Sequence, residues 1–109
     1  MGKNTLQKGS VRCIVFKEND IWYGVGLEFN VVEEGQDPLE VLAGLHQALS
    51  GYVETARKYK MKPLSLNQKS DKEYEAMWQQ LEKQQQPAGK EIYHFGYYPG
   101  AFSKTFAVV

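Results

Sequence analysis

Residues able to build a redox or metal centre are scarce in this sequence. Cys13 is the single cysteine among 109 residues, so no disulfide can close within the chain. The only histidines are His46 and His94, so a zinc site built on Cys13 would also need carboxylates. We therefore expect no metal, no cofactor and a reduced, intracellular protein.

A long apolar run and a surplus of charge are missing too. No run approaches the ~18 apolar residues that span a bilayer, and the polar start MGKNTLQKGS has no apolar signal-peptide core. We therefore expect no membrane segment and a cytoplasmic protein. The 13 basic and 13 acidic side chains balance, so composition alone selects no class of partner.

Local charge is uneven although the total is balanced. Residues 17–40 carry acidic side chains and a single Lys17, whereas residues 57–72 are basic apart from Asp71. Charge location says more about partners than the sum does, so the sequence predicts an acidic and a basic surface. The acidic side chains are Glu18, Asp20, Glu28, Glu33, Glu34, Asp37 and Glu40, and the basic ones are Arg57, Lys58, Lys60, Lys62, Lys69 and Lys72.

The first third of the chain predicts an antiparallel β-meander. Residues 11–17 are rich in β-formers, and the following Glu-Asn-Asp has the composition of a hairpin turn. Residues 21–27 alternate, with Gly24 and Gly26 on one face, which indicates close packing or a sharp bend there. Residues 29–33 are expected to form a third short strand.

The helix that follows has a clear start signal. Asp37 fits the N-cap and Pro38 the first helical position. Apolar residues then recur on one arc at ~100° per residue, which predicts that one face packs on the sheet. A flank of small residues, Gly44, Ala48 and Gly51, indicates either close packing inside the protein or a contact between copies. The apolar arc contains Val41, Leu42, Leu45, Leu49, Tyr52, Val53, Ala56 and Tyr59.

Beyond Pro63 the sequence predicts a connector and then a second, short helix. This helix is expected to begin at Ser70, with Glu73 completing a Ser-x-x-Glu capping box. Its apolar stripe is narrow, so we expect the helix to dock on the first unit and not to stand alone.

The remaining residues form an aromatic, strand-like tail. Residues 93–97 alternate as a strand does, Pro99-Gly100 suggests a turn, and residues 102–109 are expected to form another strand. The pattern leaves open where these strands pair. We expect an α+β fold, with a β-β-β-α core in residues 11–62 and with residues 63–109 completing the same single domain.

The carboxylates do not predict a catalytic site. A nuclease-like metal centre would need several of them converging on one point. The helix cap, however, accounts for Asp37 and Glu40, while Glu33 and Glu34 are adjacent on a strand and point to opposite faces.

A thiol–imidazole pair is the other catalytic arrangement to consider. Cys13 could pair with His46 or His94, but its mid-strand apolar surroundings favour a buried, inert thiol. His46, at the edge of the apolar arc, suits a packed residue better than a base. No nucleophile elbow, P-loop or dinucleotide fingerprint occurs. We therefore expect no catalytic residues and no enzyme activity.

One basic, aromatic-interleaved stretch could follow a nucleic-acid backbone. It contains Arg57, Lys58, Lys60 and Lys62. The same cations would also complement the dipole at the end of the preceding helix, so both interpretations stay open. DNA reading is not expected, because the residues after 63 lack the consecutive helices that such units need.

The order of three strands and a capped helix resembles the HicB-like family. The resemblance lies in residues 12–17, 22–25, 34–35, 37–40 and 48–54, under half of the chain, and it includes no catalytic motif. Family members share a partial RNase H-like fold, and many are antitoxins that block small HicA-type RNA-cleaving toxins. The usual C-terminal DNA-binding unit of such antitoxins has no counterpart in this sequence.

The resemblance implies a protein-binding module with a small basic toxin as its partner. The acidic segment would attract such a toxin, and we expect contacts from Glu28, Glu33, Glu34 and Trp22. A homodimer or higher oligomer, built through a sheet edge or the helix flank, is also expected. Two alternatives remain: a nucleic-acid-associated protein that uses residues 57–62, and a structural homo-oligomer.

Overall fold

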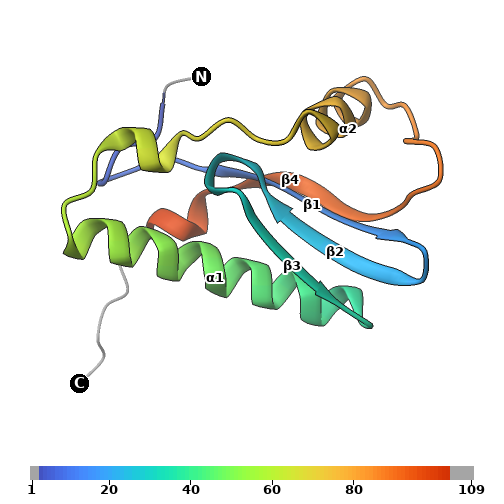
Figure 1. The fold of residues 1–109 in the computed structure, drawn as a ribbon, viewed down its shortest axis with the longest axis horizontal. Coiled ribbons are helices and arrows are strands. Elements are labelled where there is room, and N and C mark those ends of the chain that lie inside the picture. The colour runs from blue at the N-terminus through green and yellow to red at the C-terminus, as the bar shows by residue number, and fades with distance from the viewer. Residues whose placement is uncertain (1–2, 104–109) are drawn as a thin grey trace.

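The centre of the protein is a four-stranded antiparallel sheet (Figure 1), in a computed structural model that describes residues 3–103. Strands β1 (Val11–Glu18), β2 (Ile21–Gly26) and β3 (Val31–Gly35) form a meander, and β4 (Glu91–Tyr98) lies on the other side of β1. The strand order is β3-β2-β1-β4, so β3 and β4 are the edges. The expected α+β fold with an antiparallel meander is confirmed.

Two tight turns set the shape of the meander. Asn19 and Asp20 have φ values of 53° and 66°, the left-handed conformations that a two-residue hairpin turn requires. After β2 the chain forms a 3-10 turn, η1 (Leu27–Phe29), and Asn30 is left-handed at φ 54°. This turn delays β3 to Val31, so the expected strand at residues 29–33 was placed two residues too early.

The long helix α1 (Pro38–Lys58) covers one face of the sheet, with its start signal as expected. The Asp37 side chain accepts a hydrogen bond from the Leu39 backbone N–H at 2.8 Å. Tyr59 departs from the predicted apolar arc and is 67% exposed, because the helix ends at Lys58 and Tyr59 is its C-cap. The residues that α1 buries are Val41, Leu45, Leu49, Val53 and Ala56.

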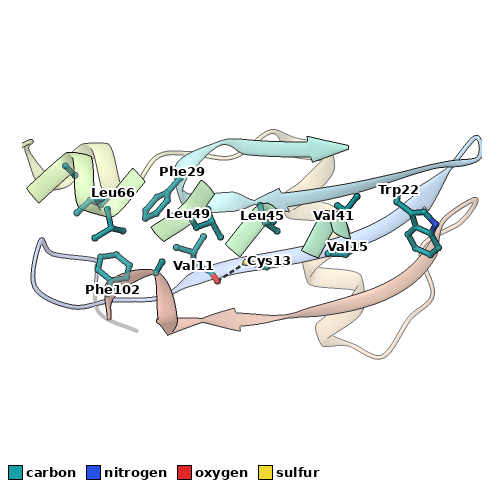
Figure 2. Close-up of a cluster of buried hydrophobic side chains, with 13 residues drawn as sticks. Val11, Cys13, Val15, Trp22, Phe29, Val41, Leu45, Leu49, Leu66 and Phe102 are labelled. Atoms are coloured by element: carbon teal, nitrogen blue, oxygen red, sulfur yellow. Dashed lines mark hydrogen bonds between the residues drawn. The ribbon is translucent and has the colours of Figure 1, made fainter. Parts of the chain in front are cut away.

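Two glycines of β2 let α1 approach the sheet closely. Figure 2 shows the helix residues concerned, Val41 and Leu49, in the core cluster between α1 and the sheet. A Cβ added to Gly26 would lie 2.5 Å from Cδ2 of Leu49, and one added to Gly24 would lie 2.9 Å from Cγ1 of Val41. Real Cβ atoms do not approach other atoms so closely, because the atoms repel each other at that distance. In a close-packed core the neighbouring side chains have little room to shift. The prediction of close packing at these glycines is confirmed.

The second helix, α2 (Lys72–Glu82), covers the opposite face of the sheet. Its residues Met77, Trp78 and Leu81 pack on a second apolar cluster, so the helix docks as expected. Its start differs from the prediction: Asp71, not Ser70, accepts the capping hydrogen bond from the Glu73 N–H at 2.9 Å. The strand residues of this cluster are Ile14, Phe16, Val25 and Leu27.

The tail adds one strand and closes one end of the core. β4 pairs with β1 from Val11↔Tyr98 to Lys17↔Glu91, with a register shift near its start. Two further 3-10 turns, η2 (Pro63–Leu66) and η3 (Pro99–Phe102), place Leu66 and Phe102 against the core on the α1 side (Figure 2). The strand expected at residues 102–109 begins in η3, and residues 104–109 lie outside the described part. No helix within residues 3–103 has the length and apolarity to cross a membrane.

Candidate partner-binding surfaces

The acidic edge of the sheet is strand β3. Glu33 stands opposite Gly24 on the α1 face, and Glu34 stands opposite Tyr23 on the α2 face. The two carboxylates therefore point to opposite faces, as expected from adjacent strand positions. Glu34 is exposed and Glu33 is half-buried, so both stand beside the free backbone of an edge strand.

The small-residue flank of α1 lies on the β3 side of the helix. At ~100° per residue it falls on the opposite side of the apolar arc from His46 and Ser50, which contact Tyr98 at the end of β4. Among residues 3–103, no atom lies within 4 Å of a Cβ added to Gly44 or Gly51. The described residues therefore do not pack closely on these glycines, and a contact with another molecule stays a prediction. Ala48, the third member of the flank, is half-buried.

Glu28 does not belong to the acidic edge of the sheet. The Arg12 backbone N–H and Nε donate to its carboxylate at 2.8 and 2.6 Å. Both Nη groups of Arg12 donate to Glu75 of α2 at 2.8 Å. Burial opposes the charged form, but the hydrogen bonds to Glu75 and Glu28 raise the pKa of Arg12 above its usual range. Both carboxylate oxygens of Glu28 are therefore engaged within the fold, and its contact with a partner stays a prediction.

The side chain of Trp22 is also buried. Its side chain is 8% exposed and belongs to the core between the sheet and α1. The Tyr93 ring meets it edge-on with centroids 6.0 Å apart, and Lys17 Nζ lies 5.8 Å from its ring centroid. Neighbouring side chains therefore cover most of Trp22, and the predicted contact with a partner stays a prediction.

The basic stretch divides into one structural arginine and three exposed lysines. Arg57 Nε donates to the Leu6 carbonyl at 2.5 Å, and its Nη2 donates to the Phe102 carbonyl at 2.7 Å. Arg57 thus joins the end of α1 to both terminal segments of the described chain. The exposed members are Lys58, Lys60 and Lys62, which remain candidates for a nucleic-acid contact.

The thiol and the two imidazoles do not form a catalytic pair. Cys13 is 0% exposed, and its Sγ lies 3.6 Å from the Val11 carbonyl as a weak donor. Burial, with a smaller contribution from Glu28, raises the pKa of Cys13 to about 12, so it stays a thiol at neutral pH. Among residues 3–103 it has no hydrogen bond to His46 or His94, and no three His, Cys, Asp or Glu side chains gather as metal ligands.

His46 predicts a pH dependence of stability. Its ring stacks on Tyr98 with centroids 3.8 Å apart, and burial, followed by the nearby His94, lowers its pKa below 6.5. As pH falls through about 6.5, His46 of the unfolded chain therefore becomes protonated, whereas His46 of the folded protein stays neutral to a lower pH. Stability should decline from about pH 6.5 downward, and urea unfolding of His46→Phe should show a weaker decline than the wild type. A constant difference between the two proteins across this range would contradict the prediction.

An exposed aromatic edge was not recognised from the sequence as a surface. Tyr93, Phe95 and Tyr97 of β4 are 46%, 40% and 45% exposed. The Trp78 ring of α2 meets Phe95 and Tyr97 edge-on, with centroids 5.8 and 5.3 Å apart. The alternation of these aromatics was the available signal, but it indicated only a strand and not its place at an edge.

Comparisons with protein-family models, curated proteins and solved structures find no match to this chain.

Proposed function

We propose that this chain is a non-catalytic protein-binding module that acts as HicB-type antitoxins do, by binding a small basic RNA-cleaving toxin. The observation that carries the proposal is the acidic edge strand. Glu33 and Glu34 lie on β3, whose outer backbone groups have no neighbouring strand in the described sheet. An extended segment of a partner can add to such an edge through main-chain hydrogen bonds.

Charge complementarity supports a basic partner at this edge. The sequence contains no lysine or arginine between Lys17 and Arg57, so no cation within that segment neutralises the carboxylates of β3. Asp37 and Glu40 at the start of α1 are exposed and continue the acidic surface. Opposite charges across an interface steer association and fix its register.

The α1 flank supports the same location. Gly44 and Gly51 carry no side chain, and among residues 3–103 nothing fills the space beside them on the β3 side of the helix. A partner strand added to β3 could therefore approach α1 closely without a steric barrier. The acidic edge and the flank would then form one continuous contact surface.

The test is co-expression of the tagged chain with the short basic protein encoded beside its gene. The two should co-purify, and the chain should relieve the growth arrest caused by that protein alone. In the Glu33→Lys/Glu34→Lys variant, binding should weaken at least about tenfold, or ~1.4 kcal/mol, because like charges then face each other.

Glu54→Lys is the matched control, since Glu54 is an exposed carboxylate of α1 outside this edge. It should bind as the wild type does. Unchanged binding of the double variant, or the lack of any neighbouring gene for a short basic protein, would contradict the proposal.

The exposed lysines favour one alternative, an RNA-associated protein. Lys58, Lys60 and Lys62 are all exposed near the end of α1, whereas Arg57 is engaged within the fold. Under this alternative the chain binds RNA in a salt-dependent way, and replacing the three lysines with glutamine abolishes that binding. The antitoxin proposal expects the same replacement to leave toxin binding unchanged.

A further inference from the structure

We infer that two copies of this chain associate through the free edge of β4, so that their sheets join into one continuous antiparallel sheet. The occupant of this edge is a second copy of the same strand. The inference is independent of the proposed function, which concerns the opposite edge of the sheet.

The first support is the open backbone of β4. Within residues 3–103 its one neighbour is β1, so the backbone groups on its other side have no strand partner. The strand has eight residues and is therefore about 26 Å long at ~3.3 Å per residue. Proteins protect edges of this kind with short strands, lysines, prolines, β-bulges or covering segments, because an open edge pairs readily with another chain. The register shift of β4 lies near its start, and the strand from His94 to Tyr98 pairs regularly with β1.

The second support is the chemistry of the edge. Residues 92–103 contain no charged side chain and no proline before Pro99, so β4 lacks the residues that normally prevent pairing. Three half-exposed aromatic side chains lie along this strand: Phe95 and Tyr97 contact Trp78 on the α2 face, and Tyr93 contacts Trp22 on the α1 face. Aromatic pairs across neighbouring antiparallel strands stabilise a sheet.

The third support is symmetry, which selects a second copy over another partner. An antiparallel pair of identical strands is related by a two-fold axis, and such an interface must be complementary to itself. The β4 edge meets this condition, because Phe95 would face its own copy and no like charges meet along the centre of the strand. A two-fold axis near the middle of β4 would bring the two copies of Phe95 close together.

The other edge fails the same condition. Two copies paired through β3 would bring Glu33 and Glu34 of each chain against those of the other. Like charges on directly facing strand positions are destabilising. The two edges therefore differ in kind: β3 fits a basic partner, and β4 fits a second copy.

The first experiment measures the mass of the full chain in solution by sedimentation velocity over a wide range of concentrations. The wild type should sediment as a dimer with twice the mass of the chain. Phe95→Lys should shift the equilibrium to monomer, because it places two like charges near the axis. Leu64→Lys changes a residue of η2 that is 77% exposed, and it should stay dimeric.

Phe95 also contacts Trp78, so a second measurement uses a small, uncharged replacement of Phe95 whose expected result is a gained cross-link and not a lost dimer. The native Cys13 is fully buried, which makes a single introduced cysteine the only accessible thiol among residues 3–103. Under mild oxidation Phe95→Cys should form a disulfide-linked dimer, because directly opposite Cβ atoms of paired strands lie about 4.5–5.5 Å apart. Val32→Cys, at a 48% exposed position on β3, should remain unlinked.

A wild type that is monomeric at every concentration would overturn the inference. The same holds for cross-linking of Val32→Cys in place of Phe95→Cys, which would locate self-association at the acidic edge. Dimerisation that persists in Phe95→Lys, with no cross-link in Phe95→Cys, would also overturn it.

Discussion

Replacing Gly26 with valine is expected to destabilise the protein by about 3 kcal/mol, a loss large enough to populate the unfolded state. Even the first added carbon would lie 2.5 Å from Cδ2 of Leu49, which is 0% exposed and surrounded by other core side chains. Leu49 has no free space to move into, so either α1 lifts from the sheet or β2 bends. Chemical denaturation in urea, followed by circular dichroism, measures the change.

Gly51→Ala is the matched control for this prediction. Gly51 lies inside α1, and no atom of residues 3–103 lies within 4 Å of a Cβ added there. Alanine is favoured over glycine inside a helix by about 1 kcal/mol, so this variant should be more stable than the wild type. A wild-type unfolding midpoint for Gly26→Val would show that α1 does not pack as closely as described.

Removing the Arg12 side chain should produce the second large effect. Arg12→Met would leave the carboxylates of Glu28 and Glu75 facing each other with no cation between them. Loss of one partner from a fully buried pair costs about 3–5 kcal/mol. Because these side chains are 17–33% exposed, water screens part of the repulsion, and we expect a loss of about 2 kcal/mol.

The triple variant Arg12→Met/Glu28→Gln/Glu75→Gln distinguishes electrostatic repulsion from lost packing. It removes both unpaired negative charges and should recover part of the stability that Arg12→Met loses. Lys58→Met, which removes an exposed cation of α1, should be within about 0.5 kcal/mol of the wild type. If Arg12→Met unfolds at the same urea concentration as Lys58→Met, the ion-pair network contributes nothing.

The elements that the sequence predicted well are those with local causes. Asp37 and Pro38 define the start of α1 through capping and a fixed φ angle, which depend on a few neighbouring residues. The position of Gly24 and Gly26 on the same face of one strand indicated close packing, because the lack of side chains there makes room for a helix. In each case the chemistry of adjacent positions determined the structure.

The parts that the sequence did not predict depend on distant residues. Nothing local indicates that β4 pairs with β1, since the alternation of its aromatics fits any edge of the sheet. The poor alternation of β1 was a signal that was not used: a strand buried on both faces reads as a continuous apolar run. Val11 and residues 13–16 are all buried because α1 covers one face and α2 the other.

Some of the predicted site residues are engaged within the fold and others are exposed, for a similar reason. Charge along the sequence identifies Glu28 and Arg57 as surface candidates, but it cannot show that the fold brings Arg12 to the first and backbone carbonyls to the second. Glu33 and Glu34 remain surface candidates because they lie on an edge strand, where side chains on both faces of the sheet are near solvent. The location of an edge follows from the complete strand order and not from any single strand.

The strand order also has a consequence for biosynthesis. β1 is a central strand, yet one of its neighbours, β4, is the last strand in chain order and leaves the ribosome after β1, β2, β3 and both helices. A nascent chain that has just completed α1 still lacks both α2 and β4. It therefore presents the bare edge of β1 together with the apolar side chains of Ile14, Phe16 and Val25. Such a surface is prone to aggregation, so the protein should depend on chaperone protection during the second half of its synthesis.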